Sequence, residues 1–215
     1  MQHISIPYVY IDDIEAHGLI ESVSALLDGY GAHPISHAPW ADGDTGTAAA
    51  FSIAYNDDHI FLKYYVTERD IKAEYVKVND PVYKDSCVEF FISFDKDANY
   101  YNLEFNCVGN CFAQYGPNKT NRVFIDRKLV NGIRHQTAIS VQDGGVMSWE
   151  LTLQIPKKVF MYHPSLNLSE ASARVNFYKC GDDLQNPHFL CWNRIEAEQP
   201  NFHLSEFFKE VSFSR

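Results

Sequence analysis

The stretch that decides the fold reads SCVEFFISF from Ser86 to Phe94 and, after a polar turn, YYNLEFN from Tyr100 to Asn106. Alternate side chains of a β-strand point to opposite faces of its sheet. One face of the two segments is therefore apolar, and it comprises Val88, Phe90, Ile92, Phe94, Tyr101, Leu103 and Phe105. The other face mixes apolar with polar side chains, and it comprises Cys87, Glu89, Phe91, Ser93, Asn102, Glu104 and Asn106. A hairpin of the two segments would place the two glutamates on one sheet face, which indicates either a solvated row or a site.

Other runs of alternating, β-branched or aromatic residues extend this pattern along the chain. These predicted strands are Ala49–Tyr55, His59–Thr67, Ile133–Val141, Met147–Gln154 and Arg174–Lys179. Clusters of Asn, Asp and Gly separate them and indicate turns. Helical periodicity is confined to Ile11–Leu27 and to a short turn after Pro156. No internal repeat or linker divides the chain. The sequence therefore predicts one domain over residues 1–215, an all-β antiparallel sandwich with long loops and a minor helix.

The charge balance restricts the partners of the chain. The 215 residues include 28 Asp and Glu against 18 Lys and Arg, so the formal net charge is 18 − 28 = −10. Nucleic acids and anionic membranes need clustered basic residues, which the sequence lacks. The start shows no signal-peptide pattern, and no apolar stretch approaches the ~20 residues of a membrane helix. We therefore expect a monomer with a neutral ligand, located in the cytoplasm unless the N-terminus is processed.

The cysteines predict free thiols. Their number, five, is odd, and their spacing is not typical of a zinc site. Small, partly buried apolar side chains are the expected role of such residues. The cysteines are Cys87, Cys107, Cys111, Cys180 and Cys191.

Several segments, in order, resemble carbohydrate-binding module family 9-like proteins, in particular the stand-alone bacterial kind. The first reads PVYKDSCVEFFI from Pro81 and is followed by YYNLEFN. Trp149-Glu150-Leu151 then runs into Ile155-Pro156, and the last third contains RVNFYKCGD from Arg174 and PHFLCW from Pro187. Phe202-His203 and Phe207-Phe208 complete the set. The likeness extends from about Trp40 to Phe213.

The resemblance implies an immunoglobulin-like sandwich that binds sugars without cleaving them, in association with glycoside hydrolases and the catabolism of polysaccharides. Two aromatic side chains clamp a glucose-like unit in xylanase-attached members, and the matching positions are Tyr83 and Trp192. The hydroxyl-binding positions match Glu89 and Glu104, with Asn106 nearby. Two positions depart from the xylanase modules: Tyr83 replaces Trp, and Glu104 is acidic where those modules carry a basic residue. These residue types suit a sugar ligand, because an aromatic ring covers the apolar face of a pyranose while carboxylates accept hydrogen bonds from its hydroxyls.

Each of these residues also has a structural interpretation. Trp192 fits a core aromatic, Tyr83 a cover for a sheet edge, and Asn106 a partner for backbone groups at a strand end. Glu89 within an apolar strand needs partners if it is ionised, and Arg122, Arg174 and Lys179 are candidates for an ion pair. Trp40 is expected in the core or at its rim, and His188 and His203 in structural hydrogen bonds.

Two further functions stay open from the residues. Glu89 and Glu104 could serve as the carboxylate pair of a glycoside hydrolase, which needs two such groups flanking the scissile bond. The turn Asp95–Asn99 resembles the start of a calcium loop, but Tyr100 and Asn106 stand where an EF-hand needs Gly and Glu. Family 9 modules bind structural calcium, so the resemblance implies that such an ion can be held, although no ligands follow from the sequence.

Overall fold

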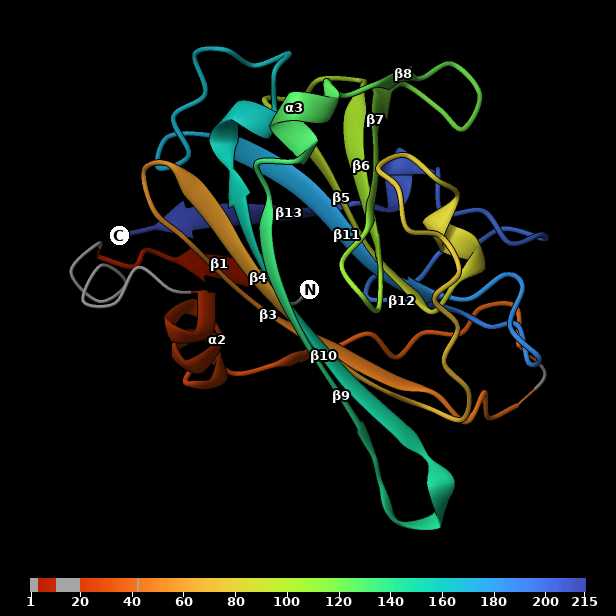
Figure 1. The fold of residues 1–215 in the computed structure, drawn as a ribbon. Coiled ribbons are helices and arrows are strands. Elements are labelled where there is room, and N and C mark those ends of the chain that lie inside the picture. The colour runs from red at the N-terminus through yellow and green to blue at the C-terminus, as the bar shows by residue number, and fades with distance from the viewer. Residues whose placement is uncertain (1–3, 11–19, 42) are drawn as a thin grey trace.

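The structure is a computed structural model that describes residues 4–10, 20–41 and 43–215. Two β-sheets pack face to face, as predicted for a sandwich (Figure 1). The larger sheet has the order β1 (Ile4–Pro7), β13 (Lys209–Ser214), β11 (Ser172–Cys180), β5 (Cys87–Phe94), β6 (Tyr100–Asn106), β7 (Cys111–Gly116) and β8 (Val123–Phe124), and β12 (Phe189–Cys191) pairs with β11. The smaller sheet has the order β2 (His33–Pro34), β3 (Ala48–Tyr55), β4 (His59–Glu68), β10 (Met147–Pro156) and β9 (Arg134–Val141).

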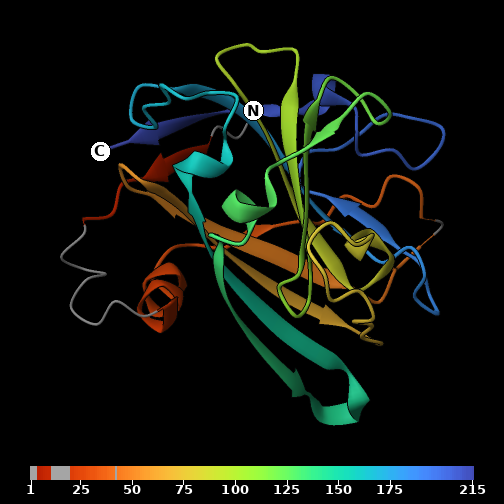
Figure 2. The ribbon, with the colours of Figure 1, turned by 45° about the horizontal axis from the view of Figure 1, so that its top comes forward.

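The strands predicted from alternation are all present, with ends shifted by a residue or two. One pairing departs from the expected antiparallel scheme, because β1 runs parallel to β13. The N-terminal strand there lies beside the C-terminal one, a pairing that no local turn signal could announce. The long hairpin of β9 and β10 projects beyond the sandwich (Figure 2).

Helical structure is minor. The helix predicted over Ile11–Leu27 is seen as α2 (Ile20–Asp28), which packs on the smaller sheet through Val23 and Leu27, and residues 11–19 of that prediction lie outside the described residues. The expected turn after Pro156 is η3 (Lys157–Val159). The other helical segments are η1 (Val82–Lys84), α3 (Arg127–Val130), η2 (Asp143–Gly145) and η4 (Ser205–Phe207). None of the described helices is long and apolar enough to span a membrane.

The main core lies between the two sheets. The apolar face predicted for β5 and β6 is buried there, opposite aromatic and aliphatic side chains of β3, β4 and β10. Phe177 of β11 lies between Phe51 and Phe90, with ring centroids 3.6 and 5.1 Å away. Each fully buried side chain of this size contributes about 1.5–3 kcal/mol. All five cysteines are free and buried, as the sequence predicts.

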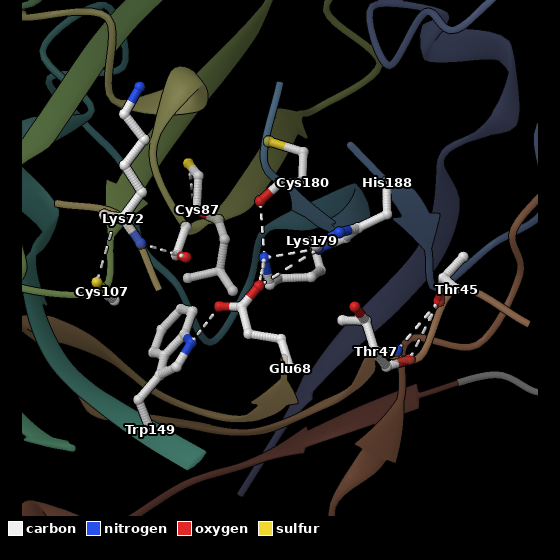
Figure 3. A network of polar contacts seen from close by, with 12 residues as sticks. Thr45, Thr47, Glu68, Lys72, Cys87, Cys107, Trp149, Lys179, Cys180 and His188 are labelled. Atoms are coloured by element: carbon white, nitrogen blue, oxygen red, sulfur yellow. Dashed lines mark hydrogen bonds and ion pairs between the residues drawn. The ribbon is translucent and has the colours of Figure 1, made fainter. Parts of the chain in front are cut away.

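An ionic cluster also crosses between the sheets (Figure 3). Glu68 of β4 accepts from the Trp149 indole at 2.6 Å and lies 2.9 Å from the ammonium group of Lys179 on β11. The imidazole Nε2 of His188 lies 2.9 Å from the same ammonium group. Lys179 therefore pairs with Glu68 rather than with Glu89, and its burial is compensated by charge and hydrogen bonds.

A second apolar cluster covers the outer face of the larger sheet. Phe91 and Tyr178 lie on that face, and Ile195, Phe202 and Phe208 of the C-terminal segment pack against them. Every residue of β5 is consequently buried. Because of this cover, the polar row of β5 and β6 is not a solvated face but lines a site.

Candidate functional site

The floor of the site is one cross-strand row on the outer face of the larger sheet. Tyr178 of β11 pairs with Glu89 of β5, Glu89 pairs with Glu104 of β6, and Glu104 pairs with Phe112 of β7. Side chains directly opposite on antiparallel strands lie close together on one face. The hairpin expected from the sequence is therefore confirmed, and it sets the two glutamates side by side.

Above this row lies a cavity of about 360 Å³, within the range of small-molecule sites. Both glutamates line it. Four aromatic side chains from different parts of the chain form its apolar walls: Tyr83, Phe112, Phe189 and Phe202. The other lining residues are Gln114, Lys119, Asp182, Pro200, Asn201 and His203.

Glu104 is buried at this floor with one of its two oxygens unpaired. Oε1 accepts a hydrogen bond of 2.6 Å from the Asn102 amide, which in turn accepts from the Arg122 guanidinium at 2.9 Å. Oε2 has no hydrogen-bond partner among the described residues. Burial raises the pKa of Glu104 to about 7, while Asn102 and Arg122 oppose that rise. A buried acceptor of this kind is costly unless a ligand satisfies it.

Glu89, in contrast, accepts its hydrogen bond from a cysteine thiol. The Cys180 thiol donates to its Oε1 at 3.1 Å. Burial raises the pKa of Glu89 well above its usual value, and the neighbouring Cys180 and Glu104 add to the rise. The ligand atoms of Cys87, Glu89 and Cys180 lie within 4.8 Å of one another, so these three side chains could offer ligands to a thiophilic metal ion.

Tyr83 is positioned by a buried carboxylate below it. Asp85 follows η1, is fully buried, and accepts from the backbone N–H groups of Glu74 and Tyr75, both at 3.0 Å. The side chain of Asn106 donates to the same carboxylate at 2.9 Å. The segment before β5 is thereby fixed, and the Tyr83 ring meets Phe112 edge-to-face at 6.2 Å.

Two loops close the remaining sides. Arg122 ties down the β7–β8 loop by donating to the carbonyl groups of Gly116 and Tyr100, at 3.0 and 2.8 Å. A side chain at Gly116 would place Cβ 2.1 Å from the Asn121 carbonyl oxygen, so this close approach requires glycine. The loop carries Lys119 to the cavity.

The C-terminal segment supplies the other wall. The Tyr178 hydroxyl donates to the Phe202 carbonyl at 3.1 Å, and the two rings stack at 4.2 Å. The His203 Nδ1 lies 2.9 Å from the Tyr100 hydroxyl. Burial lowers the pKa of His203 to about 3, with a smaller contribution from Arg122, so its imidazole is neutral at pH 7.

The structure brings three of the five candidate residues together and places the other two elsewhere. Tyr83, Glu89 and Glu104 line the cavity. Asn106 holds Asp85 and the Tyr75 carbonyl, which agrees with its structural interpretation. Trp192 lies in the core between the sheets, edge-on to Phe51 and Phe177.

The position of Trp192 follows from its backbone, which donates to the Phe177 carbonyl and so continues the pairing with β11. Its ring then turns inward, under the ammonium group of Lys209 at 5.1 Å. Trp40 stands behind the cavity wall, where its indole donates to the Ala197 carbonyl at 2.8 Å and its ring meets Phe189 and Phe202. His188 and His203 make structural hydrogen bonds, as expected.

Sequence reasoning missed the other walls of the cavity. Phe112 could have been found by parity once β7 was recognised, since it stands directly opposite Glu104. Phe189, Phe202 and Asp182 come from aperiodic segments, where no alternation shows which way a side chain points.

In the turn that resembles a calcium loop, one of the two carboxylates, that of Asp97, already accepts several hydrogen bonds. Asp97 Oδ1 accepts from the backbone and side chain of Asn99, at 2.9 and 3.1 Å, and the Tyr115 hydroxyl donates to Oδ2. A bound calcium ion would compete with these donors, and a calcium site stays a prediction.

The fold and cavity define a β-sandwich binding module. The sequence model of carbohydrate-binding family 9 matches residues 22–213, and the chain belongs to this family. A crystal structure of a Bacteroides uniformis protein proposed to bind carbohydrate is similar over 99% of both chains, with 33% identity and a TM-score of 0.88. A search of curated protein sequences found no match.

Two further solved structures share the fold at low identity. Both are family 9 modules from Caldicellulosiruptor kristjanssonii, one in complex with cellotriose and one with glucose. Each is 11% identical, with TM-scores of 0.58 and 0.57. They cover 99% of this chain, which covers 93% and 95% of theirs.

Proposed function

We propose that the cavity above Glu89 and Glu104 binds a mono- or oligosaccharide without cleaving it. The unpaired Oε2 of Glu104 carries this proposal, because a buried carboxyl oxygen without a partner, on a residue that lines a cavity, calls for a donor from a ligand. Sugar hydroxyls are such donors, and the aromatic walls suit the apolar face of a pyranose. The family match supports the same conclusion.

The positions of the two carboxyl groups favour binding over hydrolysis. A glycoside hydrolase needs an acid and a second carboxylate that flank the scissile bond. Glu89 and Glu104 instead stand next to each other on paired strands, in the floor of one cavity. Two adjacent acceptors match two neighbouring hydroxyls of one sugar ring. The family resemblance supports a role in the use of polysaccharides, and neutral gluco-configured sugars are the first ligands to test.

Calorimetric titration with a panel of neutral mono- and oligosaccharides tests the proposal. We expect binding at micromolar to millimolar concentrations, and a loss of at least about tenfold in Tyr83→Ala, which corresponds to about 1.4 kcal/mol. Trp192→Phe is the matched aromatic control, because that ring lies in the core and should leave affinity unchanged. A panel in which every sugar fails at millimolar concentration, or a Trp192→Phe variant that folds but loses binding, contradicts the proposal.

A further inference from the structure

The lining of the cavity holds more acidic than basic side chains. Glu89, Glu104 and Asp182 all contribute carboxyl groups to it, whereas Lys119 is the cation among its described lining residues. His203 is neutral at pH 7 and adds no positive charge. Burial also raises the pKa of Asp182, so all three carboxyl groups are held where ionisation is costly.

The described part of the protein provides a hydrogen-bond donor to only one of the two Glu104 carboxyl oxygens. Arg122 acts through Asn102, whose amide donates to Oε1. Oε2 has no partner among the described residues, although only 4% of Glu104 is exposed. Glu104 itself is among the residues that line a cavity that is acidic and otherwise aromatic.

A ligand with a positive charge fits this lining better than a neutral one. An ammonium group offers several donors, and charge-assisted hydrogen bonds to carboxylates are roughly twice as strong as neutral ones. A nearby ammonium group would also lower the pKa of these carboxyl groups and so favour their ionised form, and it is attracted by aromatic faces. The four rings of the walls still call for a flat apolar surface, which a pyranose has and a bare cation lacks.

We propose that the cavity prefers a saccharide that bears a free, protonated amine, with the ammonium group hydrogen-bonded to Glu104 Oε2. The proposal rests on the saccharide binding proposed above and names the chemical class of the ligand. An unsubstituted hexosamine is the simplest member of that class. Its N-acetyl derivative, in which the charge is removed, should lose the preference.

Calorimetry near pH 7 with glucosamine, glucose and N-acetylglucosamine tests the proposal, since an aliphatic amine of this kind is then largely protonated. Glucosamine should bind about tenfold more tightly than either neutral sugar, and the ratio should fall towards one in Glu104→Gln. Glu210→Gln, at an exposed position of β13, makes the same substitution away from the cavity and should keep the ratio. Asp182→Asn, at the cavity wall, provides a second variant that should reduce the ratio.

The outcomes separate this proposal from the one before it. Equal or weaker binding of glucosamine alongside measurable binding of glucose overturns the amine preference and leaves saccharide binding intact. A preference that persists in both Glu104→Gln and Asp182→Asn also overturns it, because the ammonium group must then lie elsewhere. A panel in which no sugar binds overturns both proposals.

Discussion

At the scale of single residues, the proposed ligand binding on the outer face of the larger sheet depends on two adjacent glutamates, Glu89 and Glu104. Their parity and pairing follow from the alternation in β5 and β6, so the sequence alone could predict that they meet. It could not predict their burial, because the cover comes from a C-terminal segment without periodicity. The same segment explains Trp192, whose direction depends on how its backbone joins β11.

The raised pKa of Glu104 makes stability depend on pH. Its pKa is about 7 in the folded protein against an ordinary value of 4.5, so between these values the folded state binds more protons than the unfolded state. The free energy of unfolding therefore decreases as pH rises from about 4.5 to 7, by on the order of 3 kcal/mol for this group. The charged or titratable groups around it are Glu89, Asp182, Arg122, Lys119 and Tyr83.

Glu104→Gln should remove this loss of stability. We expect the variant to be more stable than the original protein above pH 7 and to show a flatter pH dependence between 4.5 and 7. Denaturant unfolding at several pH values measures both effects. Glu210→Gln, at an exposed position, should leave the pH dependence unchanged. If Glu104→Gln did not reduce the pH dependence of the free energy of unfolding, the raised pKa of Glu104 would be contradicted.

At the scale of elements, the site depends on how the loops are fixed to a rigid sheet. The alternating strands were predictable from sequence, as were the short turn after β10 and the apolar face towards the core. Strands β7 and β12 and the parallel pairing of β1 were not, because their residues carry too little alternation or pair with distant segments. Three of the five candidate site residues could be found because they stand on β5, on β6 and beside them.

Removing Asp85 should uncouple Tyr83 from the sheet. Asp85→Ala leaves two backbone N–H groups and the Asn106 amide without their acceptor in a buried place. We expect a loss of about 3 kcal/mol or more in stability, since each unsatisfied group costs about 1–3 kcal/mol, and weaker saccharide binding. Thermal unfolding and calorimetry measure the two effects.

Asp80→Ala is the matched control for this prediction. Asp80 lies in the same segment, but its carboxylate accepts from Lys77 N–H at an exposed position. That change should cost well under 1 kcal/mol and leave binding intact. If the two variants behaved alike, the role given to Asp85 would have to be abandoned.

At the scale of the whole molecule, the two sheets are joined by apolar packing and by the buried cluster of Glu68, Lys179 and His188. The cluster sits beneath the strand that carries Cys180, on the opposite side of the sheet from the cavity. Burial and the neighbouring ammonium group of Lys179 lower the pKa of His188 to about 4. The cluster thus joins one acidic and one basic side chain to an imidazole that is neutral at pH 7.

Replacing one member of the Glu68–Lys179 pair should destabilise the protein more than replacing both. Lys179→Met leaves the buried carboxyl group of Glu68 without its basic partner, and we expect a loss of about 3–5 kcal/mol in the free energy of unfolding. In a Glu68→Gln background the same change should cost clearly less, because no buried carboxyl group is then left without its basic partner. A double-mutant cycle by chemical denaturation measures the difference. Additive effects of the two substitutions would show that the groups do not interact.

The central claim is that a sugar occupies the cavity above Glu89 and Glu104. A crystal structure of the protein soaked with a saccharide that calorimetry shows to bind tests it most directly. The account predicts a pyranose against the Tyr83 and Phe112 rings, with a donor within hydrogen-bond distance of Glu104 Oε2. A sugar bound at another surface, with this cavity empty, would contradict it.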